Sequence, residues 1–84
     1  MSYEKVAQVQ TRTIIGVKQT LKAMRDGLVK EVYIAEDADH FVTEKVAILA
    51  KDLDIPLQRV DSMKKLGAAC GIDVGASTVA IKQS

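Results

Sequence analysis

The sequence has little of the chemistry on which most enzymes and metal sites depend. Its 84 residues include one Cys and one His, no Trp, and only 4% aromatic residues. A single Cys rules out an internal disulfide and a Cys-based zinc site, and it is typical of a reducing compartment. The first residues, MSYEK, lack the basic start and apolar run of a signal peptide, and no apolar run approaches the ~20 residues that span a bilayer. We therefore expect a cytoplasmic protein that does not enter a membrane.

What the chain does contain is enough apolar material for one small core. Apolar residues make up 48% of the sequence, and Ile, Val, Leu and Ala must supply the packing. A chain of 84 residues leaves no room for a second domain, so residues 1–84 are expected to form a single domain.

The formal net charge of +1 hides an uneven distribution along the chain. Residues 1–30 have six Lys or Arg against two acidic residues, residues 31–61 have three against eight, and residues 62–84 have three against one. If the first and last segments meet in space, one side of the fold is basic and attracts phosphate, and the other is acidic. Ordinary surface scatter of charge is the alternative.

Apolar periodicity predicts two helices. One begins at Val17 and the other at His40, and each has apolar residues at helical spacing along one face. These residues are Val17, Leu21, Met24 and Leu28 in the first helix, and Val42, Val46, Leu49, Ala50 and Leu53 in the second. Gly27 is a natural stop for the first helix, Asp39 can cap the start of the second, and Pro56 lies just beyond its end.

Short β-branched runs predict strands around these helices. The expected strands are Thr13–Ile15, Lys30–Ala35, Pro56–Val60 and Thr78–Ile81, and two further short helices are expected at Ser2–Gln10 and Ser62–Ala69, the latter capped by Ser62. Helices and strands then alternate along the chain, which favours a mostly parallel sheet with helices on both faces.

The residues that could carry catalysis are few. A Cys–His dyad would need His40 and Cys70 to converge, and we favour a solvent-exposed His and a half-buried small Cys instead. The acidic run Glu36, Asp37 and Asp39 follows a strand, where Mg²⁺-binding carboxylates occur, but a helix N-terminus also favours acidic residues. We prefer the helix explanation, and we expect neither an enzyme nor a bound metal or cofactor.

The start of the Val17 helix has the features of an anion-binding surface. With the apolar stripe turned inward, Lys18, Lys22 and Arg25 share one flank, and Gln19 lies beside them. Gly16 allows close backbone approach, and the free N–H groups of the first turn add partial positive charge. An ordinary solvated helix flank is the alternative.

The segment LGAACGIDVGAST, residues 66–78, places apolar side chains in a glycine-rich loop. Ile72 and Val74 lie among three glycines, and loops usually carry polar residues. A short apolar tip suggests contact with a flat apolar surface such as an exposed nucleobase. Alternatively, Ile72 and Val74 pack into the core.

These two segments carry a resemblance to a known family. The chain resembles the kink-turn RNA-binding ribosomal proteins, the L-seven-Ae and L-thirty-e superfamily, and in particular its small bacterial members. The family pattern Gly-x-Asn-Glu-x-x-Lys reads here Gly16-Val17-Lys18-Gln19-Thr20-Leu21-Lys22, and the pattern Leu-Gly-x-x-x-Gly-Ile-Asp-Val matches residues 66–74. The stretch VYIAEDAD, residues 32–39, is also similar, so the resemblance covers nearly the whole chain.

The resemblance implies an α/β fold, a three-layer α/β/α sandwich around a four-stranded mixed sheet with one antiparallel strand. It implies a non-catalytic protein whose helix start reads sheared G·A pairs in a kinked RNA, while the glycine-rich loop covers the bulged nucleotides. With the nearby positive charges added, the expected RNA-binding residues are Gly16, Val17, Lys18, Gln19, Lys22, Lys64, Lys65, Ile72, Asp73 and Val74. The expected partner is a kink-turn in ribosomal RNA, a riboswitch or another non-coding RNA, bound by a monomer.

Two departures from the family pattern bear on affinity. Lys18 replaces an Asn that can donate and accept, whereas Lys only donates, although guanine O6 is a suitable acceptor. Gln19 replaces Glu and keeps a neutral acceptor for guanine N–H groups. The rival hypothesis is a ribosome-associated or regulatory protein-interaction module that uses the acidic face between Glu36 and Asp61.

Overall fold

The computed structural model describes residues 2–83, and its elements follow the predicted order. They are α1 (Ser2–Gln8), a 3₁₀ turn (Gln10–Arg12), β1 (Thr13–Ile15), α2 (Val17–Arg25), β2 (Val29–Ala35), α3 (His40–Asp52), β3 (Leu57–Val60), α4 (Met63–Ala69) and β4 (Thr78–Lys82). The predicted helix over Ser2–Gln10 ends at Gln8, where the chain turns into the 3₁₀ segment. The other boundaries differ from the prediction by a residue or two, except at the end of α2.

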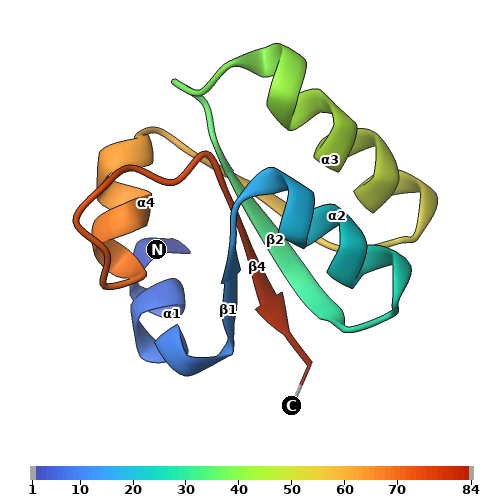
Figure 1. Ribbon diagram of the computed structural model, residues 1–84, viewed down its shortest axis with the longest axis horizontal. Helices are drawn as coiled ribbons and strands as arrows, with labels where there is room; N and C mark the ends of the chain where they lie inside the picture. Colours follow the sequence, from blue (N-terminus) through green and yellow to red (C-terminus); the bar gives the residue numbers. More distant parts are fainter. Residues whose placement is uncertain (1, 84) are drawn as a thin grey trace.

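The four strands form one mixed sheet in the order β1-β4-β2-β3 (Figure 1). Only β2 and β3 pair in parallel, with Val32 opposite Leu57 and Ala35 opposite Val60. The last strand lies between β1 and β2 and is antiparallel to both. The expectation of a mostly parallel sheet is therefore wrong for the pairings, although β1, β2 and β3 run in the same direction. The mixed sheet with one antiparallel strand is confirmed.

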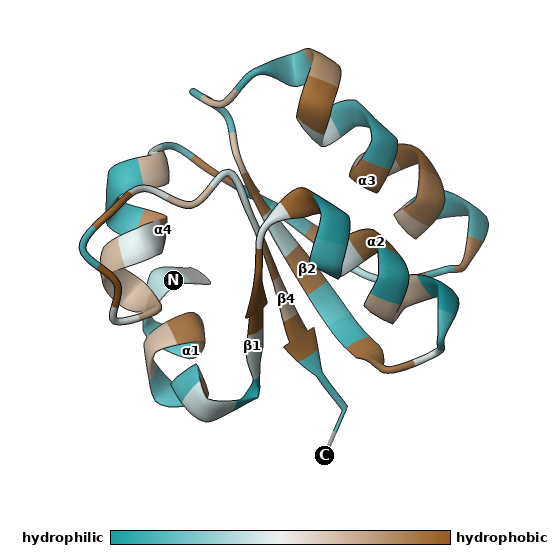
Figure 2. Ribbon diagram, in the orientation of Figure 1, coloured by the Kyte–Doolittle hydropathy of each residue, from teal (hydrophilic) through white to brown (hydrophobic). Residues whose placement is uncertain are grey.

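Helices cover both faces of the sheet, as the three-layer expectation requires. Figure 1 shows α1 and α4 on one face and α2 and α3 on the other. Because successive side chains of a strand point to opposite faces, β2 sends Tyr33 and Ala35 into the core under α1 and α4, and Val32 and Ile34 into the core under α2 and α3. Figure 2 shows apolar residues along β1 and β4, and in α2 and α3 at intervals between hydrophilic ones.

The predicted apolar stripes are correct only in part. Helix α2 ends at Arg25 because Gly27 takes a left-handed φ of +74°, so Leu28 lies beyond the helix and is 50% exposed. Its buried residues are Thr20, Ala23 and Met24, while Val17 and Leu21 are half-buried. In α3 the buried residues are Thr43, Val46 and Ala50, whereas Val42 and Leu53 are exposed. The inward face of each helix thus includes a threonine and an alanine beside one larger apolar residue, Met24 in α2 and Val46 in α3.

No helix within residues 2–83 is long and apolar enough to cross a membrane.

A buried hydroxyl at the start of β4 generates a stability prediction. Within residues 2–83 the Thr78 side chain is fully buried and its Oγ1 has no hydrogen-bond partner. Because an unpaired buried polar group costs about 1–3 kcal/mol, Thr78→Val should raise the free energy of unfolding by about 1 kcal/mol. Urea denaturation measures this free energy of unfolding. Thr43→Val is the control, since the Thr43 hydroxyl donates to the Asp39 carbonyl oxygen at 3.4 Å and its loss should destabilise. Equal destabilisation by both changes would contradict the prediction.

Candidate nucleic-acid interface

The two segments selected from the sequence meet at one end of the sheet. The Gly16 N–H donates to the Thr78 carbonyl oxygen at 2.9 Å, and the ladder continues with Ile15 opposite Val79. This bond joins the start of α2 to the end of the loop over residues 71–77, which we call the glycine loop. Figure 1 shows the start of α2 beside the segment that leads into β4. Strand pairing thus holds the helix start and the glycine loop side by side.

The N-terminus of α2 is open, unlike those of α3 and α4. Gly16 is its N-cap, with φ +104°, and no side chain accepts a hydrogen bond from the first turn. In contrast, the Asp39 carboxylate accepts from the Phe41 N–H at the start of α3, and Ser62 Oγ accepts from the Lys65 N–H in α4. The first N–H groups of a helix have no partners within it and attract anions and hydrogen-bond acceptors. The α2 start therefore keeps its donors available.

Polar side chains extend this donor surface along α2. Lys18, Gln19 and Lys22 are exposed, and among residues 2–83 no carboxylate forms an ion pair with either lysine. Gln19 and Lys22 line a shallow hollow of about 290 Å³ together with Lys82 at the end of β4. Lys82 could not be chosen from the sequence, because its neighbours in this hollow lie more than fifty positions away along the chain; Asp26 lines the same hollow.

Arg25, the last residue of α2, differs from Lys22 in its surroundings. It borders a separate hollow between α2 and α3, where Lys45 and Asp52 also lie. Lys22 and Arg25 thus border different hollows, although helical spacing keeps both on the same exposed flank as Lys18.

The glycine loop is held tightly against α4. A Cβ on Gly67 would lie 2.0 Å from the Val74 carbonyl oxygen, so only glycine permits this approach. A Cβ on Gly75 would come within 3.2 Å of the Met63 Cβ. Backbone N–H groups on both sides of the tip donate to α4: that of Ile72 to the Gly67 oxygen at 3.1 Å, and that of Ala76 to the Met63 oxygen at 3.0 Å.

The two apolar residues of the loop differ in burial. Val74 is 69% exposed at the tip, whereas Ile72 is half-buried and packs against the core under α1 and α4. Ile72 therefore packs into the core, as the alternative predicted, while contact of the exposed Val74 with a nucleobase stays a prediction. Asp73 is exposed between them, and Lys64 is exposed on α4. The Lys65 ammonium lies 3.6 Å from the Asp61 carboxylate, which partly offsets its charge.

Two residues of the acidic run, Asp37 and Asp39, form hydrogen bonds with helix starts. Asp39 caps α3, and the Asp37 carboxylate accepts from the Met63 N–H at the start of α4, with 2.8 Å between Oδ1 and N. Glu36 is exposed, and its carbonyl oxygen lies 3.3 Å from His40 Nε2. The helix explanation is therefore confirmed for Asp39 at the start of α3, while Asp37 bonds to the start of a different helix, α4.

The single cysteine is poorly suited to react. Cys70 is buried at the end of α4, and burial raises the pKa of its thiol above the usual range. A thiol must lose its proton to act as a nucleophile. Within residues 2–83, no group of three or more His, Cys, Asp or Glu side chains is placed to hold a metal ion.

Comparison with known proteins identifies a family that the chain matches and several similar proteins. The sequence profile of the ribosomal protein L7Ae/L30e/S12e/Gadd45 family matches residues 1–84. A Halalkalibacterium halodurans protein named as RNA-binding is 59% identical over 83 residues, which cover 99% of this chain and all of the relative. A Geobacillus stearothermophilus protein, also named as RNA-binding, is 53% identical over 96% of this chain and 98% of its own length. The solved structure of the Giardia lamblia 15.5kD RNA binding protein superposes with a TM-score of 0.89 at 25% identity, over 99% of this chain and 74% of that one.

The exposure of Val74 predicts that its replacement leaves the fold intact. Val74→Asp should change the free energy of unfolding by no more than about 0.5 kcal/mol, because the side chain stands in solvent. Gly67→Ala is the contrasting variant: its methyl group collides with the loop backbone, and we expect a loss of about 1–3 kcal/mol. Thermal and urea unfolding measure both. Unfolding of the domain by Val74→Asp would show that Val74 belongs to the core.

Proposed function

Because the chain belongs to the ribosomal protein L7Ae/L30e/S12e/Gadd45 family, we propose that it binds structured RNA, and specifically the kink-turn, without catalysis. One observation supports this most directly. The Gly16–Thr78 hydrogen bond sets an uncapped helix start, rich in donors, beside a loop with an exposed apolar tip. Backbone phosphates and base edges require donors, and an unstacked base requires an apolar surface.

Each part of the surface has a role in this proposal. The start of α2 enters the groove next to the sheared G·A pairs, where Lys18 and Lys22 donate to guanine acceptors or phosphates. Gln19 can both donate and accept at a base edge. The Val74 tip covers the bulged nucleotides, and Lys64 contributes positive charge nearby. Lys82 extends the positive charge beyond the residues chosen from sequence.

The proposed mechanism is a shift in the RNA population. A kink-turn RNA exchanges between extended and bent forms, and a protein that binds the bent form more tightly increases its population. The protein surface is fixed by backbone bonds before RNA arrives, so little binding energy is lost in ordering it. We propose a cytoplasmic monomer as the binding species, with a ribosomal or other non-coding RNA as partner.

A paired titration tests base recognition. Replacing the sheared G·A pairs with Watson–Crick pairs should cost the wild-type protein about 3 kcal/mol, because base contacts and the kink are both lost. Gln19→Leu keeps the side chain's size but removes its donor and acceptor, so it should reduce this difference between the two RNAs. Fluorescence anisotropy at one fixed salt concentration measures all four affinities. If Gln19→Leu discriminates as well as wild type, α2 only anchors phosphate.

The same titration separates charge from position on α2. Lys22→Gln should weaken binding to both RNAs, with an extra loss for the kink-turn if its ammonium reaches guanine O6. Arg25→Gln is the matched control, since it makes the same change of charge beside the separate hollow between α2 and α3. We expect Arg25→Gln to act weakly and equally on both RNAs. A larger effect at Arg25 than at Lys22 would contradict the proposed orientation.

Affinity for the kink-turn should fall with salt at a shallow slope. The cationic groups near the interface are few, so neutralising about two to four phosphates is expected. Titration across a series of KCl concentrations gives the slope. An affinity that does not depend on salt would argue against RNA binding by this surface and for the protein-interaction hypothesis.

A further inference from the structure

The position of the glycine loop depends on α4, a helix too short to be stable on its own. Helix α4 has seven residues, below the ~12–15 that an isolated helix needs to be stable in water. The loop contacts it at Gly67 and Met63, as described above, so any shift at the start of α4 moves Val74 at the tip.

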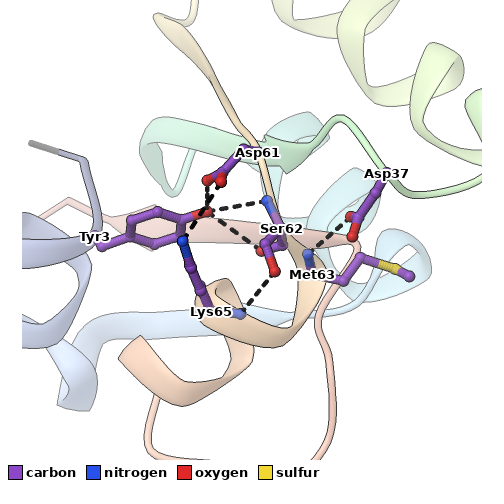
Figure 3. A network of polar contacts seen from close by, with 6 residues as sticks. All are labelled: Tyr3, Asp37, Asp61, Ser62, Met63 and Lys65. Atoms are coloured by element: carbon purple, nitrogen blue, oxygen red, sulfur yellow. Dashed lines mark hydrogen bonds and ion pairs between the residues drawn. The ribbon is translucent and has the colours of Figure 1, made fainter.

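Contacts from distant segments fix the start of α4 (Figure 3). From the turn after β2, Asp37 accepts the Met63 N–H at 2.8 Å. From α1, the Tyr3 hydroxyl accepts the Ser62 N–H at 3.0 Å and donates to the Asp61 carboxylate. One phenol oxygen thus bridges the two residues that lead into the helix, across 59 positions of sequence.

The protonation states support this bridge. Burial, followed by the hydrogen bond to Asp61, raises the pKa of the Tyr3 hydroxyl, and the same bond lowers the pKa of Asp61. At neutral pH the tyrosine is therefore a protonated donor and the aspartate an ionised acceptor. A hydrogen bond with one charged partner is stronger than a neutral one.

We propose that Tyr3, although it lies on α1, is a positioning residue for RNA binding, because its hydroxyl holds the start of α4 and so the glycine loop. This inference rests on the function proposed above. Asp37 acts with Tyr3 from the other side of the same helix start. Neither residue needs to touch RNA.

The test removes one oxygen atom from each of the chain's two tyrosines in turn. Tyr3→Phe leaves the Ser62 N–H without this acceptor and should lower kink-turn affinity about threefold to tenfold. Tyr33→Phe is the matched control: its ring packs under α1 and α4, but its hydroxyl donates to Glu31 of β2 at 3.3 Å and bonds to no residue of α4, so affinity should not change. Equal losses of affinity from both variants would indicate a general loss of stability and would overturn the proposal.

Amide hydrogen exchange supplies a readout that does not need RNA. In Tyr3→Phe the N–H groups of Ile72 and Ala76, which bond to α4, should exchange faster than in wild type and in Tyr33→Phe. If wild-type protein fails to bind the kink-turn while exchange accelerates as expected, the proposed function fails and the coupling of Tyr3 to the loop stands. If the RNA binds and neither exchange nor affinity responds to Tyr3→Phe, the coupling is wrong and the function stands.

Further variants test whether the effect on RNA affinity acts through the start of α4 and the glycine loop. Asp37→Ala removes a negative charge, which by charge alone should tighten RNA binding, but loss of the Met63 contact should weaken it. Weaker binding supports positioning, and tighter binding contradicts it.

In a double-mutant cycle, the affinity losses from Tyr3→Phe and Val74→Ala should not add, because both act through the loop. Those from Tyr3→Phe and Gln19→Leu should add, and additivity in both pairs would overturn the proposal.

Discussion

The position of β4 between β1 and β2 is the constraint from which the rest of the surface follows. Because β4 runs against both neighbours, its first residue lies at the end of the sheet where β1 finishes and α2 begins. The Gly16–Thr78 bond is the last step of that ladder. A sheet in which every pairing was parallel would place the start of the final strand at the opposite end. The helix start and the glycine loop would then lie at opposite ends of the sheet.

Acidic residues near this end of the sheet would repel RNA if their charges were free. Three of them have partners inside the protein: Asp37 holds α4, Asp39 caps α3, and Asp61 bonds to Tyr3 and lies near Lys65. Each of these contacts places negative charge at a helix start or beside a cation, where it is stabilising. Among the starts of α2, α3 and α4, that of α2 has no side-chain cap and so favours an anion. Two acidic residues of the middle segment, Asp37 and Asp39, thus bond to the starts of α4 and α3, whereas the start of α2 in the basic first segment has no acidic cap.

Local features were predictable from sequence, and features that depend on strand pairing were not. Alternating runs, Gly27, Asp39 and Ser62 marked the elements because propensity and capping act within a few residues. Alternation alone indicated the wrong strand pairing, because it predicts strands that all run in the same direction, whereas β4 runs against both neighbours and lies in the middle of the sheet. Lys82 and Tyr3 escaped notice because their neighbours lie more than fifty positions away in the sequence.

The glycine loop shows how a small domain can present apolar residues in a loop without leaving it mobile. Ile72 packs inward and anchors the segment, Gly67 and Gly75 bring its backbone onto α4, and Val74 alone of the apolar pair faces solvent. The entropy of ordering this loop is lost when the domain folds, so it does not oppose later binding. A preformed surface binds most tightly a partner that already matches its shape. In the proposed function, this preformed shape is what favours the bent form of the RNA over the extended one.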